Sequence, residues 1–94
     1  SAFSVKRMDE EEAWRANYQF IQKHYPALCK KAFRFYLQRV HVLIGTIPKE
    51  QRKEYSQQFH YLKNIMKNNM LFMIFKSGLN WKYRIKFALD YILL

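Results

Sequence analysis

The sequence predicts an all-α fold, a single domain over residues 1–94 built as a compact bundle of four to five helices. Three observations predict it. The 94 residues include only two glycines and two prolines, so few positions favour a turn. Half of the residues are hydrophobic, which is enough apolar surface for the core of one small domain. Apolar side chains also recur every three to four residues, which is the period of an amphipathic helix.

The first two helices are expected over residues 9–24 and 26–45. Asp9 can cap the first helix, and the acidic residues after it lie where the helix dipole favours negative charge. Pro26 suits the first turn of the second helix. Apolar residues at helical spacing form one face of each helix: Trp14, Tyr18 and Ile21 in the first, and Leu28, Ala32, Phe33, Tyr36, Val40, Leu43 and Ile44 in the second. Phe35 and Val42 fall on another side, which predicts that the second helix is central.

Three further helices are expected over residues 48–68, 70–76 and 80–93. Gly45 is expected to close the second helix, and Pro48 to open the third. Periodicity alone cannot distinguish a short helix from a buried strand over 70–76, but the helical neighbours favour a helix. Asn80 is a good N-terminal cap for the last helix.

The last helix is amphipathic and permits more than one orientation. One side carries Trp81, Ile85, Ala88, Leu89 and Ile92, and the other carries Lys82, Lys86 and Asp90. The apolar stripe can be buried in the bundle or can rest on a membrane surface, and the pattern favours the two equally. Both can also hold, with one stripe inward and Tyr83, Phe87 and Tyr91 outward.

The net charge of +10 is unevenly distributed. Four of the seven acidic residues lie within residues 9–12, whereas residues 13–94 carry fifteen Lys and Arg against three acidic residues. Such an excess favours an anionic partner: phospholipid headgroups, nucleic acid or an acidic surface of another domain. A solvated basic face is the simpler alternative. We expect no membrane-spanning segment, because every apolar run is far shorter than the ~20 residues required.

No catalytic, cofactor-binding or metal-binding residue is predicted. His24, His41 and His60 have no second ligand-type residue three or four positions away on a shared face. Cys29 lacks a neighbouring base, so we expect it to be a small buried apolar residue. The acids of residues 9–12 are explained by the dipole at the helix start, and no glycine-rich phosphate loop occurs. We therefore expect a noncatalytic domain without a cofactor. A lone cysteine also fits a reducing cytoplasm.

Among the anionic partners, nucleic acid is disfavoured, because no helix presents a clear set of polar side chains for reading base edges. An amphipathic helix with an aromatic residue and cations instead suits the headgroup region of a membrane. The candidate contacts with a membrane or partner are Trp81, Lys82, Tyr83, Arg84 and Lys86. Two alternatives stay open: a small basic helical module that binds nucleic acid or regulates another protein, and a homodimer that covers the apolar stripe.

Three segments carry a family resemblance. They are "EAWRANYQFIQKHYPAL", "KKAFRFYLQRVHVLI" and "LKNIMKNNMLFMIFKSGLNWKYRIKFALDYILL". In pattern and composition, residues 10–94 resemble the region downstream of the catalytic domain in bacterial family-two glycosyltransferases. The most specific part is Ser77-Gly-Leu-Asn-Trp-Lys-Tyr-Arg-Ile-Lys86, a break followed by a basic amphipathic helix.

The resemblance implies a C-terminal helical accessory domain of a longer bacterial enzyme. Members of that family have a GT-A catalytic domain, a nucleotide-sugar donor and a divalent metal held by Asp-X-Asp. This sequence has no Asp-X-Asp, so no catalytic residue is carried over. The resemblance further implies surface polysaccharide synthesis on lipid-linked acceptors, with the domain peripheral on the inner face of the cell membrane and the parent's catalytic domain as its partner.

Overall fold

The computed structural model describes residues 3–93, and it confirms the all-α class. Five α-helices form the bundle: α1 (Met8–His24), α2 (Cys29–Gly45), α3 (Ser56–Asn68), α4 (Met70–Phe75) and α5 (Trp81–Leu93). Three single 3-10 turns lie between or before them: Val5–Arg7, Pro26–Leu28 and Lys49–Gln51. No β-strand occurs in residues 3–93.

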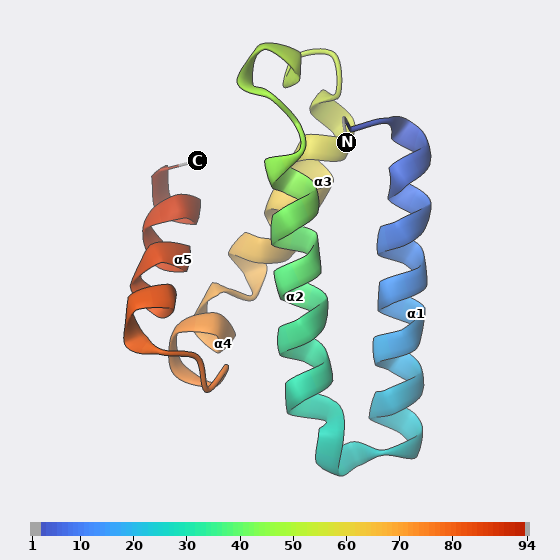
Figure 1. The fold of residues 1–94 in the computed structure, drawn as a ribbon, viewed down its shortest axis with the longest axis vertical. Helices are drawn as coiled ribbons and strands as arrows, with labels where there is room; N and C mark the ends of the chain where they lie inside the picture. The colour runs from blue at the N-terminus through green and yellow to red at the C-terminus, as the bar shows by residue number, and fades with distance from the viewer. Residues whose placement is uncertain (1–2, 94) are drawn as a thin grey trace.

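Helix α2 is the central element, as the sequence predicts. Helices α1 and α2 form a long antiparallel hairpin, α3 packs along α2, and the short α4–α5 hairpin lies on the side of α2 opposite α1 (Figure 1). The bundle is elongated, with extents of 40 × 28 × 21 Å. This arrangement leaves α1 and α5 as the two outer flanks of the molecule.

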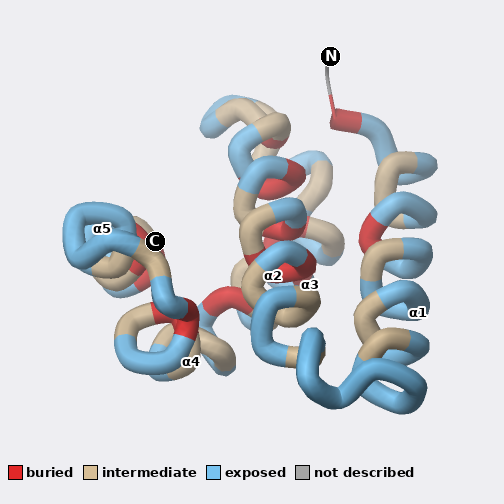
Figure 2. Tube along the Cα trace, turned by 60° about the horizontal axis from the view of Figure 1, so that its bottom comes forward, coloured by how far each residue is buried: buried red, intermediate tan, exposed pale blue. Residues whose placement is uncertain are grey.

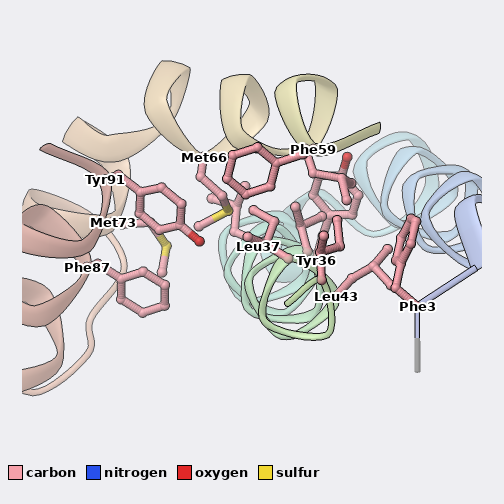
Figure 3. Packing of buried hydrophobic residues seen from close by; sticks show 13 residues of the cluster. Phe3, Tyr36, Leu37, Leu43, Phe59, Met66, Met73, Phe87 and Tyr91 are labelled. Carbon is pink, nitrogen blue, oxygen red and sulfur yellow. The ribbon is translucent and has the colours of Figure 1, made fainter. Parts of the chain in front are cut away.

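The core follows one face of α2 from end to end. Leu37, Val40 and Leu43 of this helix are completely buried, and so is Leu62 of α3. Figure 3 shows the cluster continuing from Phe3 at one end to the side chains of α4 and α5 at the other. The buried residues of those two helices are Met73, Phe87 and Tyr91. One continuous core therefore holds all five helices.

The segment 48–68 is not a single helix, and this boundary prediction is wrong. Pro48 is extended (φ −64°, ψ 153°), Lys49–Gln51 forms one 3-10 turn, and α3 begins only at Ser56. Residues 49–54 are all polar or charged, so a helix there has no apolar face to pack against the core. Tyr55 instead packs its ring edge-to-face on Phe3, with ring centres 5.0 Å apart.

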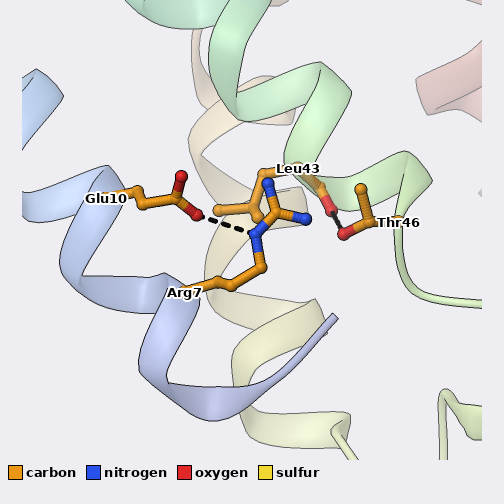
Figure 4. Close-up of polar contacts among 4 residues, drawn as sticks. All are labelled: Arg7, Glu10, Leu43 and Thr46. Carbon is orange, nitrogen blue, oxygen red and sulfur yellow. Dashed lines mark hydrogen bonds and ion pairs between the residues drawn. The ribbon is translucent and has the colours of Figure 1, made fainter. Parts of the chain in front are cut away.

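Two of the expected helix caps also differ in the structure. Helix α1 starts at Met8 after a 3-10 turn, so Asp9 lies inside its first turn. At the end of α2 it is Thr46 that closes the helix, because its hydroxyl donates to the Leu43 carbonyl at 2.6 Å (Figure 4). The Asn80 cap is confirmed: its Oδ1 accepts the backbone N–H of Lys82 at 3.3 Å. Gly78, before this cap, has a φ of 74°, which favours glycine.

Glu11 is a buried carboxylate that joins three helices. It is 2% exposed on α1, and its two oxygens accept hydrogen bonds from Tyr36 of α2 at 2.8 Å and Tyr61 of α3 at 2.9 Å. The Arg15 Nε lies 3.4 Å from the same carboxylate. These partners compensate the cost of removing the charge from water. The dipole at the helix start therefore does not explain Glu11, which is a structural residue of the interior.

Removing one phenol from this cluster tests its contribution to stability. We expect Tyr36→Phe to lower the free energy of unfolding by about 1.5–3 kcal/mol, because a hydrogen bond to a charged acceptor is lost and the carboxylate stays buried. Urea denaturation measures the change. Tyr25→Phe is the matched control, since Tyr25 is 55% exposed and should change stability by less than about 0.5 kcal/mol. Equal unfolding midpoints for the two variants would contradict this role.

Candidate functional site

Helix α5 contacts the rest of the bundle through one aromatic face. Phe87 is 8% exposed and Tyr91 is 2% exposed. The Tyr91 hydroxyl forms a hydrogen bond with Nδ1 of His41 on α2, and the His41 and Phe87 ring centres are 4.7 Å apart. The outward placement considered for Tyr83, Phe87 and Tyr91 is therefore wrong for the last two. Tyr83 alone of the three is exposed.

The opposite side of α5 exposes its aliphatic stripe. Trp81 is 59% exposed, Ile85 49%, Leu89 52% and Ile92 65%. Figure 2 shows α5 as a mostly exposed helix with few buried positions. Burial of this stripe in the bundle, one of the two orientations left open by the sequence, does not occur. The aromatic pair is buried instead, because it brings a hydroxyl that finds its partner in His41.

The exposed stripe continues onto α4. Phe75 is 71% exposed and Leu71, one turn earlier, is 69% exposed. A shallow hollow between the two helices joins these surfaces, lined by Ile74, Phe75, Trp81, Arg84, Ile85 and Ala88. The α4–α5 apolar face is defined here as Leu71, Phe75, Trp81, Ile85, Leu89 and Ile92. A continuous exposed apolar surface of this kind is typical of a site for a partner or a membrane.

Cations border this face. Lys82 is exposed and its Nζ lies 6.0 Å from the centre of the Trp81 ring. Lys76 and Lys86 are also exposed, at the edges of the two helices: Lys76 lines a hollow shared with Phe33 of α2, and Lys86 lines one shared with His41 of α2. From residue 56 to 93 the sequence has six Lys and Arg against one acidic residue, Asp90. The apolar face therefore lies within a strongly positive half of the molecule.

Arg84, one of the five candidate contact residues, has a different environment from the other four. Its Nη1 donates to the Ile74 carbonyl at 3.0 Å, and its Nε is buried without a hydrogen-bond partner. This side chain links α5 to α4 across the hollow. Trp81, Lys82, Tyr83 and Lys86 are all exposed on α5.

The groups that carry chemistry in many enzymes are scattered. His24 and His60 are exposed, and Cys29 is half-buried with its Sγ 3.7 Å from the Tyr18 hydroxyl. Within the described part of the chain, no three His, Cys, Asp or Glu side chains come together as a metal site. Over the same residues, no helix combines the length and the apolar character needed to cross a membrane.

Comparisons with known proteins add nothing to the geometry. No protein-family model, curated protein or solved structure matches this sequence. The resemblance to family-two glycosyltransferases therefore rests on the sequence pattern alone. The candidate site is defined by its exposed side chains and its charge.

The attachment of α5 to α2 predicts a pH-dependent stability. Burial lowers the pKa of His41 below its usual value; the Asp90 carboxylate opposes this shift and the Lys86 ammonium adds to it. As the pH falls through the unfolded-state pKa of about 6.5, the unfolded chain takes up a proton before the folded one does. His41 therefore favours the folded state fully above that pH, and its contribution decreases as the pH falls below it.

Urea denaturation at pH values above and below this pKa measures the effect. We expect His41→Gln to give a flatter dependence of stability on pH than the unchanged chain. His60→Gln is the control, because His60 is exposed and should leave the slope as it was. A slope that is identical in the His41 and His60 variants would contradict the assignment.

Proposed function

We propose that this chain is a noncatalytic docking domain that rests on an anionic membrane surface through the α4–α5 apolar face. One observation supports the proposal above all: six large apolar side chains lie about half or more exposed on one surface, with the exposed Lys82 beside it and Lys76 and Lys86 exposed elsewhere on the same helix pair. A folded domain gains no stability from such a surface in water. It gains free energy when an apolar layer covers these side chains.

A membrane surface suits both parts of this face. A helix lying flat in the interface inserts its apolar side a few ångströms below the headgroups, and Trp81 has the amphipathic ring favoured at that depth. Lys76, Lys82 and Lys86 have long aliphatic stems that let their ammonium groups stay among the phosphates. Each cation near an anionic leaflet contributes about 1 kcal/mol. Together these terms favour reversible attachment.

The same charges disfavour the other occupants. A second copy of the chain, docked face to face, brings the lysines of one molecule against those of the other. Nucleic acid attracts the lysines, but Ile85, Leu89 and Ile92 gain little from a phosphate backbone or from stacking on bases. The exposed apolar side chains therefore favour a lipid surface, which can bury them, over a partner that offers only negative charge.

The parent protein in this proposal is a bacterial family-two glycosyltransferase, on the strength of the sequence pattern in residues 77–86. In such an enzyme the domain would hold the GT-A catalytic domain near a lipid-linked acceptor on the cytoplasmic face of the membrane. Holding the two together raises their effective concentration without any chemistry by this domain. The coding DNA around the present sequence tests this part: an adjoining α/β domain with Asp-X-Asp supports it, and an unrelated domain removes it.

Vesicle co-sedimentation tests the membrane contact. We expect the triple change Lys76→Glu, Lys82→Glu and Lys86→Glu to remove about 3 kcal/mol of attraction, a loss of about a hundredfold in affinity for vesicles rich in phosphatidylglycerol. The matched control reverses Lys23, Lys49 and Lys53, which are equally exposed but lie on α1 and on the 49–55 turn. The control should lose far less, because these lysines lie off the face.

A second variant tests the apolar part. Ile85→Ser with Leu89→Ser changes two exposed residues, so the fold should persist, and binding to the same vesicles should fall by at least tenfold. Unaltered binding by this variant, or equal losses in the two charge triples, would overturn the proposal. Salt-sensitive binding to a DNA oligonucleotide that ignores Ile85 and Leu89 would favour the nucleic-acid alternative instead.

A further inference from the structure

A second surface lies between α1 and α2, away from the α4–α5 face. Two adjoining hollows form one groove along this hairpin, because both are lined by Trp14, Phe35 and Arg39. The lining residues recur at helical spacing on each side: Glu10, Trp14 and Asn17 on α1, with Arg7 of the preceding 3-10 turn, and Ala32, Phe35, Arg39 and Val42 on α2. Both walls are therefore continuous ridges with space between them.

The groove is open because α3 covers only one side of the hairpin. On the covered side Leu37 and Val40 of α2 are completely buried. On the groove side of the same helix Phe35 is 54% exposed and Val42 is 64% exposed. Helical bundles normally bury such residues beneath another helix. The α1–α2 hairpin thus has one vacant place at which a further helix would complete a bundle.

Arg39 gives this groove a positive centre. Its guanidinium lies 4.5 Å from the Phe35 ring centre and 5.6 Å from the Trp14 ring centre, and no carboxylate among residues 3–93 pairs with it. The nearby Glu10 is engaged, since it accepts the Nε of Arg7 at 2.7 Å (Figure 4). Arg39 is therefore held between two rings and free to bind an anion, and a carboxylate is a good partner for a planar guanidinium.

We propose that this groove binds an amphipathic helix of a partner protein, with an Asp or Glu in the middle of its apolar face. The apolar residues of that helix cover Phe35 and Val42, and the carboxylate pairs with Arg39. An α-helix suits the site because residues three, four and seven positions apart fit between two helical ridges. The lining residues span about ten positions of each helix, which gives a groove about 15 Å long, enough for roughly three turns of a bound helix. This surface does not depend on the α4–α5 face.

A pair of designed peptides tests the proposal on the full 94-residue chain. Both are amphipathic helices of the same sequence with leucines along one face, and they differ only in a central Glu or Lys. The chain carries Trp81→Phe, so Trp14 in the groove becomes the single tryptophan and its fluorescence reports binding there. We expect the Glu peptide to bind at least tenfold more tightly than the Lys peptide, and Arg39→Glu to reverse this order.

Matched variants separate the groove from the overall charge. Lys67→Glu changes the net charge equally at an exposed position on α3 and should leave the preference for Glu as it was. Phe35→Ser with Val42→Ser should weaken both peptides, and circular dichroism verifies that these exposed changes leave the helices intact. Equal affinity for the two peptides, or no binding at millimolar concentration, would overturn the proposal. Loss of binding in Ile85→Ser with Leu89→Ser would also overturn it, because it would place the peptide on the α4–α5 face.

Discussion

The rotation of α5 about its own axis is the constraint on which the proposed function depends. A helix on the outside of a bundle can bury only one face, and here Tyr91 determines which one. Its ring lies in the core beside Phe87, and its hydroxyl has a partner in His41. With that face turned inward, the aliphatic stripe of the helix must face outward. A single buried phenol therefore decides that the molecule has an exposed apolar flank.

The central helix α2 sets the positions of both candidate surfaces. It carries Tyr36 towards Glu11 of α1, His41 towards α5, and Phe35 and Arg39 towards the open groove. Because these residues lie on one rigid helix, the α1–α2 groove and the α4–α5 pair are fixed relative to one another, with α1 and α5 on opposite sides of α2 (Figure 1). The two surfaces have no lining residue in common, although Gln38 and Val42 of the groove also line a hollow beside α5. Taken together, the two proposals would make this domain a link between a partner helix and a membrane surface.

Local sequence patterns predict where the helices form. They do not predict features that depend on a contact with a residue far away in the sequence. Asn80 marks the start of α5, and the three-to-four spacing identifies the helical stretches, but the second helix, expected from residue 26, begins at Cys29 because Pro26–Leu28 forms a 3-10 turn. The orientation of α5 could not be predicted, because its two apolar stripes are equally good and the deciding partner, His41, lies fifty residues away. The sequence suggests only a helix-dipole role for Glu11 for the same reason: its phenol partners come from other helices. A polar run without apolar residues at 49–54 was the available signal against a long third helix.

The groove was missed although its residues are visible in the sequence. Phe35 and Val42 fall outside the main stripe of α2, and in the sequence this position indicates only that the helix is central. Their exposure follows from the small number of helices, since five elements cannot surround α2 completely. An aromatic residue on the second side of a central helix, with an arginine one turn later, was the signal that could have indicated a binding surface.

The link between α4 and α5 through Arg84 has a consequence for the energetics of lipid attachment. Many interfacial helices are unstructured in solution, and ordering their backbone reduces the affinity that their apolar residues would otherwise provide. Here Arg84 and Tyr91 hold α5 in place within the folded domain, without any lipid. The entropy cost of ordering its backbone is therefore part of the folding free energy and does not reduce the affinity for lipid. In the proposed attachment, the residence time on a bilayer would then depend on the headgroup composition, and a change in anionic lipid content would directly control where the protein is located.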